Sequence, residues 1–165
     1  MIIYHPFKDA NHCLYRLISI LYKNESLISE DLLSFMDFYY LFPSQLKKIT
    51  GWPRANSKLY KEVNNIDESY EIIDNPRRIF FELRDIRKNT LAYLLSKKIV
   101  IVKNDNYLKL DANKLPLELS KKIELDTFRK TVEYSLITKE LPKIKIKGKT
   151  GLKFKSNLME YRYDS

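Results

Sequence analysis

The chain has 165 residues, a hydrophobic fraction of 44% and a formal net charge of +9, which fits one domain, or one domain with a small appendage. Its one cysteine excludes a disulfide within the chain, and no stretch reaches the roughly 20 apolar residues that span a bilayer. Without a signal peptide, the protein is expected in the cytoplasm, with no membrane contact. The basic charge favours a polyanion or an acidic protein as partner, although a low-GC genome also produces Lys-rich chains.

A first helix is expected over residues 9–23, because Asp9 is a suitable N-cap and apolar side chains recur at helical spacing behind it. This helix also carries a narrow polar stripe nearly opposite its core face. Side chains three and four positions apart on such a stripe can touch. We therefore expect a hydrogen-bonded cluster that fixes how the N-terminus meets the domain or a partner protein. Its members are Tyr4, His5, Asp9, His12 and Arg16.

A second helix is expected from a Ser29 cap to Pro43, which stops it. Its many aromatic residues are better explained by a wide core face than by a ligand-binding box. A short helix follows over 45–50. The periodicity then fails over 51–74, which predicts a long connecting loop with a turn or two of helix over 58–63.

Asn75 and Pro76 predict a helix start, with a capping Asn and Pro at the first helical position. Apolar residues continue at helical spacing to about Lys98, either as one long helix or as two helices with a kink. Two short apolar segments follow, over 99–102 and 107–110, and the Asn/Asp-rich turn between them predicts a β-hairpin. Helices followed directly by a hairpin are the outline of a winged helix-turn-helix.

Further helices are expected over 116–122 and 126–139. Basic and apolar residues then alternate over 143–147, and again over 152–155 after a turn that contains glycine. Strict alternation is typical of half-buried strands. These segments therefore predict a second β-hairpin with lysines concentrated on one side or at its tip.

The expected fold class is mainly α with small β-hairpins. A winged helix-turn-helix-like domain would occupy residues 1–111, including the connecting loop 51–74. A C-terminal extension of helices and a basic hairpin tail would occupy residues 112–165 and pack on the same unit.

Catalytic and metal chemistry have little support in this sequence. His5, Asp9 and His12 are metal-ligand types at short spacing, but no third His exists and Arg16 on the same stripe would repel a cation. The Gly-Lys-Thr at 148–150 lacks the earlier Gly of a phosphate loop. The single cysteine has no base facing it. We therefore expect no enzyme, no catalytic residue, no metal and no cofactor.

Binding is better supported than catalysis. A winged helix can place its recognition helix in the major groove of DNA and its hairpin on phosphate. A solvated basic surface would explain the same charges, and winged helices also bind proteins. The candidate nucleic-acid contacts are Arg84, Arg87, Lys103, Lys109, Lys145, Lys147, Lys149, Lys153 and Lys155.

Several motifs, in this order, resemble the middle component of three-component ABC (ABC-3C) systems, which are anti-phage operons of the Lamassu type. The first motif combines Tyr4, His5, Pro6, Asp9, His12 and Arg16. The others are Asp37-Phe-Tyr-Tyr-Leu-Phe-Pro43, Asn75-Pro-Arg-Arg-Ile-Phe80, Gly148-Lys-Thr-Gly-Leu-Lys153 and Leu158-Met-Glu-Tyr-Arg-Tyr-Asp164.

The resemblance implies a winged-helix accessory subunit without catalytic activity. Such a subunit would bind an SMC-like ABC ATPase, as kleisin-associated winged-helix proteins do, and connect it to a separate effector, commonly a nuclease. Double-stranded DNA is a further expected contact. Two other hypotheses stay open: a free-standing winged-helix DNA-binding transcriptional regulator, and a small metalloenzyme that uses His5, Asp9 and His12.

Overall fold

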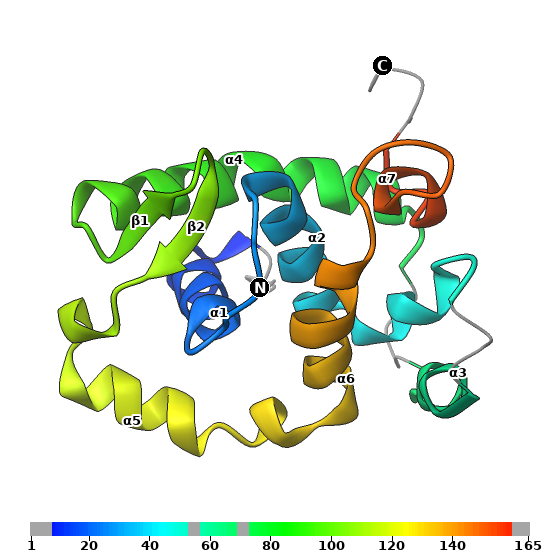
Figure 1. Ribbon diagram of the computed structural model, residues 1–165, viewed down its shortest axis with the longest axis horizontal. Helices are drawn as coiled ribbons and strands as arrows, with labels where there is room; N and C mark the ends of the chain where they lie inside the picture. The colour runs from blue at the N-terminus through cyan, green and yellow to red at the C-terminus, as the bar shows by residue number, and fades with distance from the viewer. Residues whose placement is uncertain (1–7, 53–56, 69–72, 160–165) are drawn as a thin grey trace, which may run out of the picture.

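Three helices pack together at the centre of the fold (Figure 1). They are α1 (Ala10–Leu21), α2 (Glu30–Leu41) and α4 (Pro76–Ser96). Figure 1 shows α4 running along one side of the molecule, with α1 and α2 beside it. The computed structural model describes the chain over residues 8–52, 57–68 and 73–159.

Side-chain caps explain where these helices begin. The Asp9 carboxylate accepts hydrogen bonds from the backbone N–H groups of Asn11 and His12, at 2.8 and 3.3 Å. Ser29 and Asn75 cap α2 and α4 in the same way. The predicted helix starts are therefore confirmed. The α4 helix is a single element of 21 residues, which decides between the one-helix and two-helix alternatives.

The core is built around the aromatic residues of α2, which is buried from Leu32 to Tyr39. The Phe80 ring of α4 lies against the rings of Phe35 and Phe38, with centroids 5.0 and 5.8 Å apart. Fully burying a side chain of this size contributes about 1.5 to 3 kcal/mol. The wide core face expected for the second helix is therefore confirmed.

The first predicted hairpin is also confirmed. Strands β1 (Val100–Lys103) and β2 (Tyr107–Leu110) pair antiparallel, with Val100 opposite Leu110. The turn residues Asn104, Asp105 and Asn106 have φ values of 47°, 63° and 129°. Asn and Asp tolerate this left-handed region better than other non-glycine residues, which explains the composition of the turn.

An isolated antiparallel bridge joins the α1–α2 connection to the hairpin. Ser29 pairs with Tyr107, and the Leu108 N–H donates to the Ile28 carbonyl at 2.8 Å. The segment before α2 therefore lies along the edge of β2.

The connection between α2 and α4 contains more structure than a loop. It includes η2 (Pro43–Lys48) and α3 (Ser57–Asn64), so the turn or two of helix expected over 58–63 is confirmed. Trp52 anchors the segment between them, because its indole N–H donates to the Leu46 carbonyl at 3.0 Å. Leu59 and Val63 bury the inner face of α3.

The C-terminal part is a chain of short helices. They are η3 (Ala112–Lys114), α5 (Leu117–Leu125), η4 (Thr127–Lys130), α6 (Val132–Ser135), the π-helix η5 (Leu136–Glu140), η6 (Leu141–Lys143) and α7 (Leu152–Lys155). The helix predicted over 126–139 is divided near Thr131, whose backbone is extended and whose hydroxyl caps α6. Asp126 caps η4 instead.

Polar contacts hold these helices against α1. The Tyr15 hydroxyl donates to Asp126 at 2.5 Å, and Arg129 donates to the Ser19 carbonyl at 2.7 Å. The Tyr134 hydroxyl donates to that carbonyl as well, at 2.8 Å. The division of the chain at residue 111 stays a prediction.

The second hairpin, predicted over 143–155, is wrong. Within the described residues the sheet consists of β1 and β2 alone, and Leu152–Lys155 form one turn of helix. The first N–H groups of a helix lack partners inside it. In α7, those of Leu152 and Lys153 donate to the carbonyls of Lys145 and Ile146, at 2.6 and 3.0 Å.

The alternation in this segment has a different cause. Ile144 and Ile146 pack against the core, while Lys143, Lys145 and Lys147 are exposed. An extended chain lying on helices produces the same pattern as a strand in a sheet. None of the described helices is both long and apolar enough to cross a membrane.

Candidate functional site

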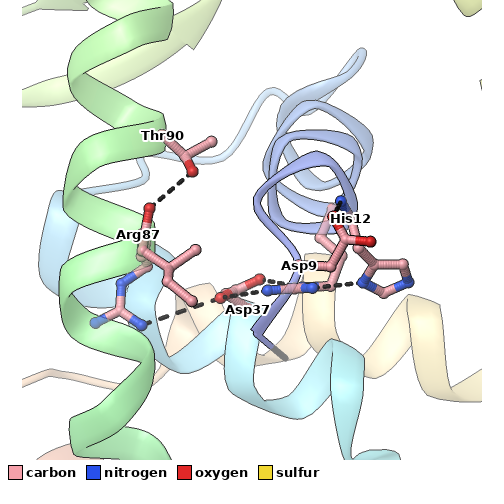
Figure 2. Close-up of polar contacts among 7 residues, drawn as sticks. Asp9, His12, Asp37, Arg87 and Thr90 are labelled. Carbon is pink, nitrogen blue, oxygen red and sulfur yellow. Dashed lines mark hydrogen bonds and ion pairs between the residues drawn. The ribbon is translucent and has the colours of Figure 1, made fainter. Parts of the chain in front are cut away.

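A buried group of charged side chains joins the three central helices (Figure 2). Arg16 of α1 donates to Asp37 of α2 through Nε, at 2.6 Å from Oδ1, and through Nη2, at 3.3 Å from Oδ2. Both side chains are 0% exposed. Paired hydrogen bonds between a guanidinium and a carboxylate are among the stronger polar contacts in proteins. This pair therefore ties α1 to α2.

Arg87 of α4 is the second cation beside Asp37. Its Nη1 lies 4.0 Å from Asp37 Oδ2, which is too far for a hydrogen bond. This Nη1 is buried and has no hydrogen-bond partner among the described residues. Burial lowers the pKa of Arg87, and the Asp37 charge opposes this shift. Two guanidiniums therefore share one carboxylate, and the cluster has an excess positive charge.

His12 completes the cluster on the α1 side. Its Nδ1 lies 2.5 Å from Arg16 Nη1. Because the guanidinium can only donate, Nδ1 must accept, which requires a neutral ring. Burial lowers the pKa of His12, and the nearby Arg16 charge lowers it further. The ring is therefore in the form that this contact needs.

The structure brings together part of the predicted N-terminal cluster. Arg16 and His12 are in contact, and Asp9 caps the same helix. Tyr4 and His5 lie outside the described residues. Arg16 has no exposed surface, so it acts inside the domain.

Asp37 was not expected to be the partner of Arg16. Its position in the sequence was a signal of this role, because it is an acidic residue among the aromatic and apolar residues expected to form the core face of the second helix. A buried carboxylate needs a cation or several donors to offset its lost hydration. The identity of that cation could not be read from sequence, because Arg16 lies 21 positions away.

The remaining reactive groups are engaged in packing. Burial raises the pKa of Cys13 to about 11, with Asp37 acting in the same direction, so its thiol stays protonated at neutral pH. Within residues 8–52, 57–68 and 73–159, no group of three or more His, Cys, Asp or Glu side chains is placed to hold a metal ion. The arrangement is therefore suited to holding helices together.

The predicted nucleic-acid contacts differ widely in exposure. Lys109 is half-buried, and its Nζ donates to the Asn24 carbonyl at 3.2 Å. Lys153 is buried, with Nζ 3.6 Å from an Asp31 oxygen. Arg87 is buried against Asp37, and Lys155 is half-buried. The candidates on the open surface are Arg84, Lys103, Lys145, Lys147 and Lys149.

The structure therefore defines the class of protein. It is a small, mainly helical protein in which the buried charged side chains connect the three central helices. Comparison with protein families identifies it further. A family model described as ABC-three component (ABC-3C) system Middle Component 5 matches residues 2–164. The chain therefore belongs to this family, and the resemblance to ABC-3C middle components is confirmed. Middle components of these systems are regulatory or adaptor-type subunits. No curated protein and no solved structure matches this chain.

Proposed function

We propose that this chain is a non-catalytic accessory subunit of a Lamassu-type anti-phage defence complex in the cytoplasm. It binds an SMC-like ABC ATPase and links it to an effector, commonly a nuclease. The observation that carries this proposal is the family match over residues 2–164. The burial of Arg16 and Asp37 in the core supports it, because these two side chains are not available for chemistry on a substrate.

The arrangement of elements supports a winged-helix type of subunit. In chain order there is a helix, a bridging segment, a helix, the long α4 helix and a hairpin. The bridge from Ser29 to Tyr107 puts the segment before α2 next to β2, as the first strand of a winged helix lies beside its hairpin. In this comparison α4 corresponds to the recognition helix and the β1–β2 turn to the wing. The region between α2 and α4 is then an insertion.

Co-expression with the neighbouring genes tests the main proposal. The tagged chain should co-purify at fixed stoichiometry with the ABC ATPase and the effector. Deleting its gene should abolish protection from phage while the other proteins are still made. Purified ATPase should hydrolyse ATP without this chain. Absence of a complex under these conditions, with all proteins soluble, would refute the accessory role.

Contact with double-stranded DNA is a second, separable part of the proposal. Lys103 on the hairpin is exposed, and so are Lys145, Lys147 and Lys149 in the segment before α7. Each phosphate contact that is lost reduces the slope of the logarithm of the binding constant against the logarithm of the salt concentration by about one. Replacing Lys145, Lys147 and Lys149 by Glu should therefore weaken DNA binding by the assembled complex and flatten its dependence on salt.

The alternative function is a free-standing winged-helix transcriptional regulator. It is favoured by the exposed Arg84 on the helix that precedes the hairpin. It predicts that the isolated chain binds a particular duplex sequence, and that Arg84→Glu abolishes this binding. Binding that does not depend on the DNA sequence, and that weakens equally when any exposed lysine is replaced, would argue against it.

A further inference from the structure

A groove of about 600 Å³ lies between α4, the start of α2 and the segment that contains Leu158 and Met159. Pockets that bind ligands are commonly about 300 to 1,000 Å³ in volume, so this groove has room for anchoring side chains. Phe81, Arg84, Arg87 and Lys88 line it along α4, and Glu30 and Asp31 line it at the start of α2. Arg84 and Arg87, two of the predicted nucleic-acid contacts, therefore lie beside aromatic rings in this groove.

The open side of the groove combines an aromatic ring with a cation. The Phe81 side chain is 64% exposed, and the Arg84 guanidinium lies 4.8 Å from the centre of its ring. Aromatic and arginine side chains carry much of the binding energy of protein interfaces. A large exposed ring held next to a guanidinium is therefore suited to an apolar side chain followed by a carboxylate.

At the inner side of the groove, Arg87 is a cation whose pairing is incomplete. It is 6% exposed, and its Nη1 has no hydrogen-bond partner within the described residues. The Asp37 carboxylate is already held by Arg16 at 2.6 Å, compared with 4.0 Å for Arg87. A poorly paired buried cation destabilises a fold. The Arg87 guanidinium also lies 5.7 Å from the centre of the Phe80 ring, but a ring provides no acceptor for Nη1. A carboxylate entering the groove would complete its pairing.

We propose that this groove binds an acidic segment of another protein of the same system, with an aromatic or aliphatic side chain beside one or two carboxylates. The apolar side chain packs on Phe81, and the carboxylates pair with Arg84, Lys88 and Arg87. This inference rests on the proposed function, because it takes the partner to be a subunit of the defence complex.

The charges of the groove favour a protein segment over nucleic acid. Four cationic and two acidic residues line it, so it is positive overall but not uniformly basic. Arg77, one of the cations, is engaged by the Asn157 carbonyl at 2.8 Å. Glu30 and Asp31 line the groove where α2 begins and would repel the phosphates of a nucleic acid lying next to them. A short segment with one acidic face can avoid them.

Photo-crosslinking in the intact complex identifies what occupies the groove. p-Benzoylphenylalanine is placed at position 81 of the full chain, which is co-expressed with the neighbouring genes. The same probe at Tyr93, which is on α4, 51% exposed and outside the groove, is the control. Position 81 should crosslink to a segment of another subunit that contains both acidic residues and an aromatic or aliphatic residue. Position 93 should not crosslink to it.

Other outcomes of the crosslinking overturn the inference. A crosslink to nucleic acid, to residues 160–165 of this chain, or equally from both positions refutes it. A complex that forms without any crosslink from position 81 refutes the groove but leaves the proposed function intact. Failure to form any complex refutes the proposed function and the inference that rests on it.

Charge variants separate binding from folding. Arg87→Met and Arg84→Glu should each reduce retention of the partner subunits on the tagged chain by about tenfold or more. The unfolding midpoint of Arg87→Met should be unchanged or raised. Lys121→Glu, an exposed position on α5, makes the same charge change as Arg84→Glu and should have no effect. If Arg87→Met fails to fold, Arg84→Glu and Phe81→Ala still test the groove. Normal retention in both of these variants refutes it.

Discussion

Asp37→Asn should strongly destabilise the protein, because Asp37 is the shared counter-ion of two buried cations. The change preserves size and removes the charge. Arg16 and Arg87 would then stay buried, at 0% and 6% exposure, without a carboxylate. Leaving a buried charge without its partner costs about 3 to 5 kcal/mol. Since a domain is stable by about 5 to 15 kcal/mol in total, this variant should be marginal at room temperature.

Urea unfolding followed by circular dichroism measures this loss, provided that the slope with urea is the same in all variants. Arg87→Met removes the second cation while keeping its apolar stem, so it should change the free energy of unfolding by less than about 1 kcal/mol, or raise it. Combining it with Asp37→Asn should recover part of the loss, because one buried cation then remains instead of two. Arg16→Ala should destabilise, because Asp37 is left with Arg87 at 4.0 Å.

Two results would refute this reasoning. The first is a loss below about 1 kcal/mol for Asp37→Asn, which is the value of an exposed ion pair. The second is a double variant whose loss equals or exceeds the sum of the two single losses. Strict additivity would mean that Asp37 and Arg87 do not interact.

Three further predictions concern pH, a turn and a cap. Because burial and Arg16 lower the pKa of His12 from 6.5, the folded protein binds this proton less readily than the unfolded chain. The free energy of unfolding should therefore decrease as the pH is lowered from about 7.5 to about 5.5. This decrease should be smaller in His12→Gln. Gly151→Ala would place a Cβ 2.3 Å from the Lys147 carbonyl oxygen, so it should cost about 1 to 3 kcal/mol in urea unfolding. Gly148→Ala meets no atom within 4 Å but requires a φ of +87°, which costs about 1 to 2 kcal/mol. Ser29→Ala removes the cap of α2, so it should lower the free energy of unfolding by about 1 kcal/mol and reduce the melting temperature. An unchanged melting temperature would exclude a capping role.

Features that depend on neighbouring residues were predictable from sequence. The starts of α1, α2 and α4 follow from Asp9, Ser29 and Asn75, because a capping side chain binds N–H groups two or three positions away. The β1–β2 turn follows from its Asn and Asp residues, which adopt positive φ at low cost. Motifs along the chain also led to the family.

What only the tertiary structure decided depends on residues far apart in the chain. Alternation over 143–155 indicates an extended segment with one apolar face, but it cannot show whether that face meets another strand or, as here, the helical core. The partner of Asp37 and the groove between Glu30 and Arg84 likewise depend on how α1, α2 and α4 pack. Local propensity constrains the backbone within a few positions, whereas ion pairs and grooves form between side chains that the completed fold brings together.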